Sequence, residues 1–376
     1  MTCPNMWLHR VVLLVLLGTT QHLVSFAHAA EVAGLVFGEP LSGLDEITKQ
    51  AFNDGFRTFV RVWKPREGLG RFINGRSCVS CHSEPVPAGS GTRANTFVLS
   101  GLRATDQTGG HIFARFEVSG ETNKSRELPD GEMARRKSPG LFGLGLLESV
   151  SDESILAHSL SNKAKGSEAV GRLPLVPGGY GRFGWRSEFA SIRDVVAHAL
   201  VVELGFPPSV RTSESLRGAR NRELGMLLTV SALTEFCRML SPPPSRHLTN
   251  DAQTGRRIFS QIGCASCHSE SLTTSPVAPP QLRSVAFHPF TDLLLHRMGT
   301  RIADSFSTGD VAADEFRTPP LWGLTSTGPP FLHDGRASTL EEAVLLHEGE
   351  AATVTVRYRQ LTRADQSRLL LFLSSL

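Results

Sequence analysis

The sequence has few cysteines, almost no net charge and no long hydrophobic run, and each absence excludes a class of protein. Six cysteines in 376 residues do not make a disulfide scaffold, which is short and dense in cysteine. The formal net charge of +3 comes from 39 basic and 36 acidic residues, so it gives no strong attraction to nucleic acid or to an anionic membrane. We therefore expect no nucleic-acid partner.

The composition that is present is that of a globular protein. Hydrophobic residues make up 40% and charged residues 20%, which excludes disordered, collagen-like and coiled-coil chains. At about 100–200 residues per domain, the length allows two domains with cores of their own. Strand signals are few and short, and the segments between helical patterns are rich in Gly, Ser, Thr and Pro. We expect a mainly α fold with long loops, with helices at 47–62, 151–160, 192–204, 222–240, 250–263, 289–298, 340–347 and 362–373.

The first residues carry the pattern of an export signal. The apolar run 11–17 is far too short to span a bilayer, which takes about 20 residues. His9 and Arg10 precede it and Ala27-His28-Ala29 follows, which is typical of a secretory signal peptide. We expect cleavage after Ala29 and a periplasmic or otherwise extracytoplasmic protein with no stable membrane insertion. The alternative is an uncleaved anchor.

Three consecutive prolines, at 242–244, form a stiff extended spacer. We place a domain boundary there. The expected organisation is a signal peptide at 1–29, an N-terminal domain at 30–241 and a C-terminal domain at 246–376.

Four of the cysteines lie in two copies of one motif, 78–82 and 264–268, each of the form Cys-x-x-Cys-His. This is the attachment motif of c-type haem: two thiols on one turn reach the two vinyl groups of a porphyrin, and the following histidine binds iron. A zinc site would require further Cys or His pairs, and a thioredoxin-like site would require a βαβ context that is missing. The export signal agrees, because cytochrome c assembly takes place outside the cytoplasm. We expect two covalently bound c-type haems, held by Cys78, Cys81, His82, Cys264, Cys267 and His268. Cys237 is left over and is expected to be a buried thiol, with intermolecular pairing as the alternative.

Several runs outside these motifs resemble the bacterial di-haem oxidoreductases, a family named for peroxidase and thiol oxidoreductase activity. The chain is in turn similar to di-haem cytochrome c peroxidases and MauG-type enzymes. The resemblance implies two cytochrome c-like domains with one haem each. It also implies electron entry at the C-terminal haem and an open distal position, where peroxide binds, at the N-terminal haem. The runs that carry it are 68–74, 138–148, 181–185, 291–299, 316–324 and 333–343.

The resemblance also implies roles for individual residues at the distal faces. In the peroxidase relatives, the distal ligand of the C-terminal haem lies 14 residues after the His of a His-x-Gly motif. In this chain that register, counted from His333, gives His347, where the relatives carry Met or Tyr, so a bis-histidine haem is expected. His296 is the competing ligand. Glu203 is the candidate acid–base group of the N-terminal haem and His198, on the same helix, is a candidate ligand or acid–base group. His111 is a weaker distal candidate.

Trp185 is expected to relay electrons between the haems, as a Trp does in the relatives, with a core tryptophan as the alternative. Arg336 is expected to bind a haem propionate, and Arg182 and Arg317 are further candidates, because the planar guanidinium suits buried carboxylates. The favoured function is a peroxidase-like di-haem oxidoreductase. It would be supplied by an electron-donor protein or small cytochrome and would reduce peroxide or another oxidant, or else oxidise a substrate as MauG-type enzymes do. The alternative is a non-enzymatic electron carrier with two six-coordinate haems.

Overall fold

The computed structural model describes residues 37–91, 97–101, 111–127, 133–208 and 221–376. The expected signal peptide lies outside these residues. In the described part, more residues lie in helices than in strands, and no helix there is both long and apolar enough to cross a membrane. Helices predominate over strands there, but many short strands accompany them, so the expectation of a mainly α fold holds only in part.

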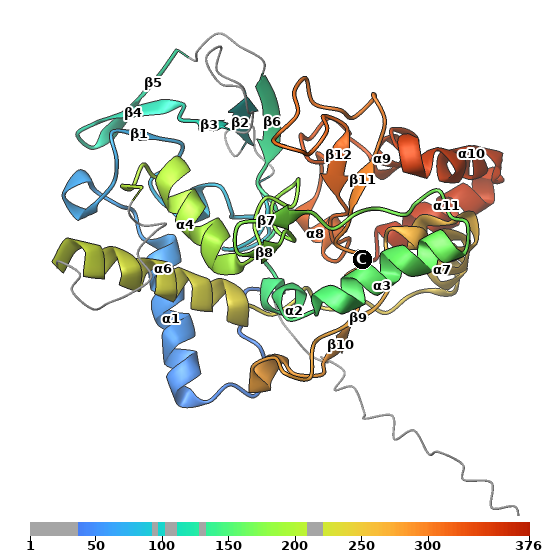
Figure 1. Cartoon of the computed structure of the whole chain (residues 1–376), viewed down its shortest axis with the longest axis horizontal. Helices are drawn as coiled ribbons and strands as arrows, with labels where there is room; N and C mark the ends of the chain where they lie inside the picture. The colour runs from blue at the N-terminus through green and yellow to red at the C-terminus, as the bar shows by residue number, and fades with distance from the viewer. Residues whose placement is uncertain (1–36, 92–96, 102–110, 128–132, 209–220) are drawn as a thin grey trace, which may run out of the picture.

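The helices fall into two groups along the chain, joined by the segment that contains the three prolines. The first group is α1 (Glu46–Val60), α2 (Leu144–Glu148), α3 (Asp152–Ala164), α4 (Ile192–Val202) and α6 (Asn221–Met239). The second is α7 (Asn250–Ile262), α8 (Leu324–Thr327), α9 (Leu340–Leu345), α10 (Ala352–Gln360) and α11 (Arg363–Leu373). Short 3₁₀ turns are η1 (Pro65–Glu67), η2 (Cys78–Ser80), η4 (Cys264–Ser266), η5 (Pro280–Leu282) and η6 (Gly349–Ala351). Figure 1 shows α1, α4 and α6 on one side and α7, α10 and α11 on the other.

The strands are short and pair in antiparallel fashion in sheets of two or three. One sheet joins β1 (Phe72–Ile73), β4 (Phe116–Ser119) and β5 (Thr122–Ser125), and another joins β3 (His111–Phe113), β2 (Phe97–Gly101) and β6 (Met133–Lys137). The two-stranded pairs are β7 (Leu175–Val176) with β8 (Gly179–Tyr180), β9 (Leu272–Thr273) with β10 (Ala286–Phe287), and β11 (Leu295–Arg297) with β12 (Glu315–Arg317).

Each group of helices contains one close helix crossing, and in both crossings a glycine lies against the backbone of the other helix. In α1, Gly55 lies against α6, where an added Cβ would stand 2.3 Å from the Ala232 carbonyl oxygen. In α7, Gly255 lies against α11, where an added Cβ would stand 2.0 Å from the Arg368 carbonyl oxygen. Glycine is required at both crossings because only a residue without Cβ lets the backbones come so close. Each crossing is followed by a phenylalanine pair, Phe59 with Phe236 and Phe259 with Phe372, at ring-centroid distances of 5.0 and 5.4 Å.

The hydrophobic core has two clusters. The larger one surrounds α1, α2, α4 and α6 and also takes in Leu282, Phe287, Leu293 and Leu294 from beyond the prolines. The smaller one surrounds α7, α10 and α11. The division of the chain at the triple proline stays a prediction.

The helix expected at 289–298 is wrong. Phe290 and Leu293 have positive φ angles of 56° and 63°, and the chain continues into β11 instead of a helix. The hydroxyl of Thr291 accepts from Leu293 N at 3.0 Å and the carboxylate of Asp292 accepts from Leu294 N at 3.0 Å. Such side chains offer the backbone hydrogen bonds that compete with those of a helix. The apolar residues of this segment are buried on every side, so their spacing shows no helical period.

Candidate haem-binding sites

The first motif lies on the turn η2, directly after β1. His82 is half-buried, and its Nδ1–H donates to the carbonyl oxygen of Pro139 at 2.9 Å, with the Gly89 carbonyl at 3.3 Å. Because a carbonyl only accepts, Nδ1 carries the proton and Nε2 is left as the basic nitrogen. Burial lowers the pKa of His82, which favours the neutral imidazole that binds metals.

The second motif follows α7 in the same manner. Gly263 ends α7 with φ of 103°, a left-handed conformation suited to glycine, and the chain turns there into η4. The Nδ1–H of His268 donates to the Phe290 carbonyl at 3.0 Å, which again leaves Nε2 as the basic nitrogen. Burial lowers the pKa of His268 to about 4.

The surroundings of the two motif histidines repeat each other. His82 lies 6.4 Å from the ring of Phe59 at 55°, and His268 lies 6.4 Å from Phe259 at 53°. These matching contacts place both histidines beside the same turn of equivalent helices.

Backbone-directed hydrogen bonds around the motifs repeat as well. The Ser90 hydroxyl donates to the Ser138 carbonyl at 2.7 Å, and the Thr291 hydroxyl donates to the Thr318 carbonyl at 2.6 Å. Short helices then start at glycines with φ near 70°, α2 after Gly143 and α8 after Gly323. Ser138 and Thr318 therefore hold equivalent places in the two halves.

The residues present fit a covalently attached haem in each half. Cys78, Cys81, Cys264 and Cys267 are half-buried and free of disulfides, and each motif histidine offers one unprotonated nitrogen. The leftover Cys237 is buried and also free, as expected.

His347 lies near His268. The positive charge of a protonated His347 contributes to lowering the pKa of His268, after burial, so the two rings are close enough to interact. The Nδ1–H of His347 donates to the Ala343 carbonyl at 2.7 Å, and this ring too keeps Nε2 as its basic nitrogen. Ligation of the second haem by His268 and His347 together stays a prediction.

His296, the competing ligand, has both ring nitrogens occupied. Nε2 lies 2.9 Å from Asp292 Oδ2 and Nδ1 lies 2.7 Å from Glu350 Oε2, and Cys267 Sγ is 3.6 Å from Nδ1. Burial alone would lower the pKa of His296, yet the bonds to Asp292, Cys267 and Glu350 hold it well above its ordinary value. A protonated ring clamped between carboxylates has no lone pair for iron, which disfavours this alternative.

No pattern in the sequence indicated this cluster, because Glu350 and Asp292 are far apart along the chain. Cys267, Asp292 and His296 also have ligand atoms within 4.8 Å of one another. With Cys267 attached to haem, a second metal there would lose its strongest ligand, so the group is better explained as a buried ion-pair network beside the second motif.

Glu203 lies at the end of α4, close to the first motif. Its Oε2 is shielded from solvent and has no hydrogen-bond partner among the described residues, and Asn74 Nδ2 is in the same condition. Burial raises the pKa of Glu203 to about 7, against smaller opposing effects of Asn74 and Arg115. The charge of Glu203 also helps to raise the pKa of Cys81, after burial, which places the carboxylate beside the expected haem attachment point. Asn74 was identified from sequence only as part of the run 68–74 that carries the family resemblance, and Arg115 was not identified.

His198 packs on Phe189, with ring centroids 4.8 Å apart. Trp185 lies between the two halves: its Nε1–H donates to the Lys137 carbonyl at 2.9 Å, and its ring meets that of His333 edge-on at 6.3 Å. Its carbonyl accepts from Arg317 N at 2.9 Å. The roles of His198 and Trp185 in catalysis stay predictions.

The candidate propionate partners differ in what they contact. Arg336 is bound to Asp334 and to the carbonyls of Arg301 and Ala303, and Arg182 to Asp152 and three carbonyls. Arg317 donates only to carbonyls, those of Gly184 and Thr318. His111 begins β3, and its side chain lies outside the described residues.

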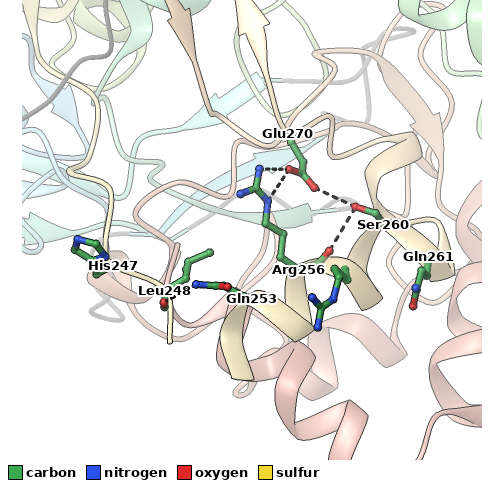
Figure 2. A pocket seen from close by; sticks show the side chains of 8 residues that line it. His247, Leu248, Gln253, Arg256, Ser260, Gln261 and Glu270 are labelled. Atoms are coloured by element: carbon green, nitrogen blue, oxygen red, sulfur yellow. Dashed lines mark hydrogen bonds and ion pairs between the residues drawn. The ribbon is translucent and has the colours of Figure 1, made fainter. Parts of the chain in front are cut away.

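An open groove of about 750 Å³ runs along the outer side of α7 (Figure 2). Arg256 Nε and the Ser260 hydroxyl donate to Glu270 there, at 2.8 and 3.0 Å. These bonds fix the segment after His268 to α7. None of the residues predicted to act on haem lines the groove.

Comparisons with known proteins bear on the C-terminal part. No curated protein matches the chain. The hydrazine synthase of Kuenenia stuttgartiensis, pressurised with 20 bar xenon, is similar in structure with a TM-score of 0.43 and 17% identity over 93% of this chain and 97% of that chain. So distant a likeness carries no argument. The model of the family described as "Di-haem oxidoreductase, putative peroxidase" matches residues 230–376, which include the second Cys-x-x-Cys-His motif and His347. Over these residues, the chain is similar to the di-haem oxidoreductase family.

Proposed function

We propose that this protein is an extracytoplasmic c-type di-haem oxidoreductase of the peroxidase kind, built of two cytochrome c-like domains. The first Cys-x-x-Cys-His motif would hold the haem at which peroxide or another oxidant reacts, and the second would hold the haem that takes electrons from a donor protein or small cytochrome. The observation that carries the proposal is the repeated anchoring of His82 and His268, combined with distal surroundings that differ between the halves. The family match supports the general di-haem redox role.

The two halves differ in the residue that lies eight positions after the capping residue of α4 and of α9. α4 begins after Ser191 and α9 after Thr339, and each of these capping side chains accepts from the backbone N–H three residues on. His347 lies eight residues after Thr339, and the residue eight after Ser191 is Ala199. An alanine has no ligand atom, so at this register α4 offers no equivalent of His347, and the neighbouring His198 packs on Phe189.

Bound haem supplies an iron that binds an oxygen of the oxidant and exchanges single electrons. The residues of the chain would supply the iron ligands and the group that transfers protons. His82 and His268 bind iron through Nε2 while the carbonyls of Gly89, Pro139 and Phe290 hold their rings in place. Glu203, with a pKa of about 7, accepts or donates a proton beside the first haem at neutral pH.

Trp185 supports passage of electrons between the halves. It bonds to Lys137 from one half and packs against His333 from the other, so it bridges the interface through side-chain contacts. The N-terminal export pattern supports an extracytoplasmic location.

The test is the ferric spectrum of the haem-loaded protein and its reaction with hydrogen peroxide. We expect one haem with a high-spin population that reacts rapidly with peroxide and one low-spin haem that does not. Ala199→His should convert the reactive haem to low spin and suppress the reaction, whereas Ala199→Leu, of similar bulk without a ligand atom, should leave it high-spin. Two low-spin haems inert to peroxide in the unaltered protein would contradict the proposal and favour an electron carrier.

A further inference from the structure

Among the described residues, the interface between the halves holds two buried cations that form no ion pair with a carboxylate. Lys137 and Arg317 are 6% and 8% exposed. Lys137 Nζ donates to the carbonyls of Gly328 and Pro330 at 3.1 and 2.7 Å. Arg317 likewise bonds only to carbonyls. Among the described residues, no carboxylate lies within ion-pair distance of either cation.

The two cations hold equivalent positions. Each directly precedes one of the equivalent residues Ser138 and Thr318. Each also reaches across the interface with its backbone, Lys137 N donating to the His333 carbonyl at 2.7 Å and Arg317 N to the Trp185 carbonyl at 2.9 Å. Each half therefore has a buried cation at the equivalent position.

Neighbouring charges do not neutralise them. Arg136 and Arg186 are also buried at the interface, and both pair with the single carboxylate of Asp304. Burial lowers the pKa of Lys137 to about 8 and that of Arg317 to about 10, although the charges of Glu188 and Asp292, which form no ion pair with Arg317, partly oppose the shift of Arg317. A buried charge is stable only when it is paired and hydrogen-bonded, so the site calls for anions that the polypeptide does not supply.

We propose that Lys137 and Arg317 bind the propionate carboxylates of the two haems at the interface, Lys137 those of the first haem and Arg317 those of the second. The assignment follows position: Lys137 lies two residues before Pro139, which anchors His82, and Arg317 precedes Thr318, which is bonded to the residue after Phe290. The inference rests on the proposed function, because it requires both haems. In this assignment Arg182 and Arg336 are not propionate partners, because their guanidinium groups are paired with Asp152 and Asp334.

The test compares the midpoint potentials of the two haems in haem-loaded variants. Lys137→Met should lower the potential of the first haem more than that of the second, and Arg317→Met should do the reverse. The reason is that an uncompensated propionate stabilises ferric over ferrous iron. Lys137→Arg and Arg317→Lys keep the charge and should restore potentials near those of the unaltered protein. The exposed Lys163→Met is the matched control.

A count of two haems per chain in the unaltered protein, from the pyridine haemochrome spectrum, tests the proposed function first and separately. If Lys137→Met and Arg317→Met carry two haems at unchanged potentials, the cations only support the fold and the inference is overturned. Should a methionine variant not accumulate, the glutamine variant at the same position takes its place in the comparison.

Discussion

Replacing Glu203 by glutamine should make the folded protein more stable and less reactive at once. Because burial raises the pKa of this carboxyl from 4.5 to about 7, keeping it ionised in the folded chain costs ~3 kcal/mol, at about 1.4 kcal/mol per pH unit. The unfolded chain releases the proton near pH 4.5 and the folded chain only near pH 7. The contribution of Glu203 to the free energy of unfolding therefore falls as pH rises through this window. Glutamine has the same shape and no proton to lose.

We expect the free energy of unfolding of Glu203→Gln to exceed that of the unaltered protein by up to ~3 kcal/mol at pH 8, with little difference near pH 5. Denaturant titrations of the haem-loaded protein across this range measure it. The second-order rate with hydrogen peroxide should fall by about 10²–10⁴-fold, and its rise with pH through neutrality should disappear, because glutamine exchanges no proton.

The exposed Glu121→Gln is the matched control for removal of one negative charge, and it should change neither quantity measurably. A stability difference for Glu203→Gln that is the same at pH 5 and pH 8 would refute the idea that the carboxyl is buried with a raised pKa. An unchanged peroxide rate would refute its role as the acid–base group while leaving its burial intact.

Three further changes test the second half. His347→Ala should convert the second haem from low to high spin in the optical spectrum; an unchanged low-spin spectrum would rule this residue out as ligand. Asp292→Asn should cost about 3 kcal/mol of unfolding free energy near neutral pH, because it breaks a buried pair with His296. The raised pKa of His296 makes the loss shrink at high pH, where the folded ring gives up its proton, so denaturant titrations showing a larger loss at high pH would count against it. Gly255→Ala should lower the free energy of unfolding by about 1–3 kcal/mol through overpacking, whereas Gly225→Ala, where an added Cβ meets nothing within 4 Å, should raise it; equal shifts of the thermal midpoint would contradict a close crossing at Gly255.

The helices with one apolar face were predictable from sequence. The expectations at 47–62 and 250–263 correspond to α1 and α7, because burial of one face and exposure of the other impose a visible period. The segment 289–298 was not predictable in this way, since burial on all sides removes the period and local side-chain bonds redirect the backbone. The helix α10 was missed, because its polar and apolar residues follow no clear helical pattern.

The sequence by itself predicted the chemistry of attachment, because two cysteines and a histidine at this fixed spacing form the attachment motif of c-type haem. The family resemblance also indicated Glu203 and His347. Only the tertiary structure decided the charge states and partners: the raised pKa of Glu203, the clamp of carboxylates on His296, and the unpaired cations Lys137 and Arg317. These depend on burial and on groups that are distant in sequence, and neither is encoded in the spacing of neighbouring residues.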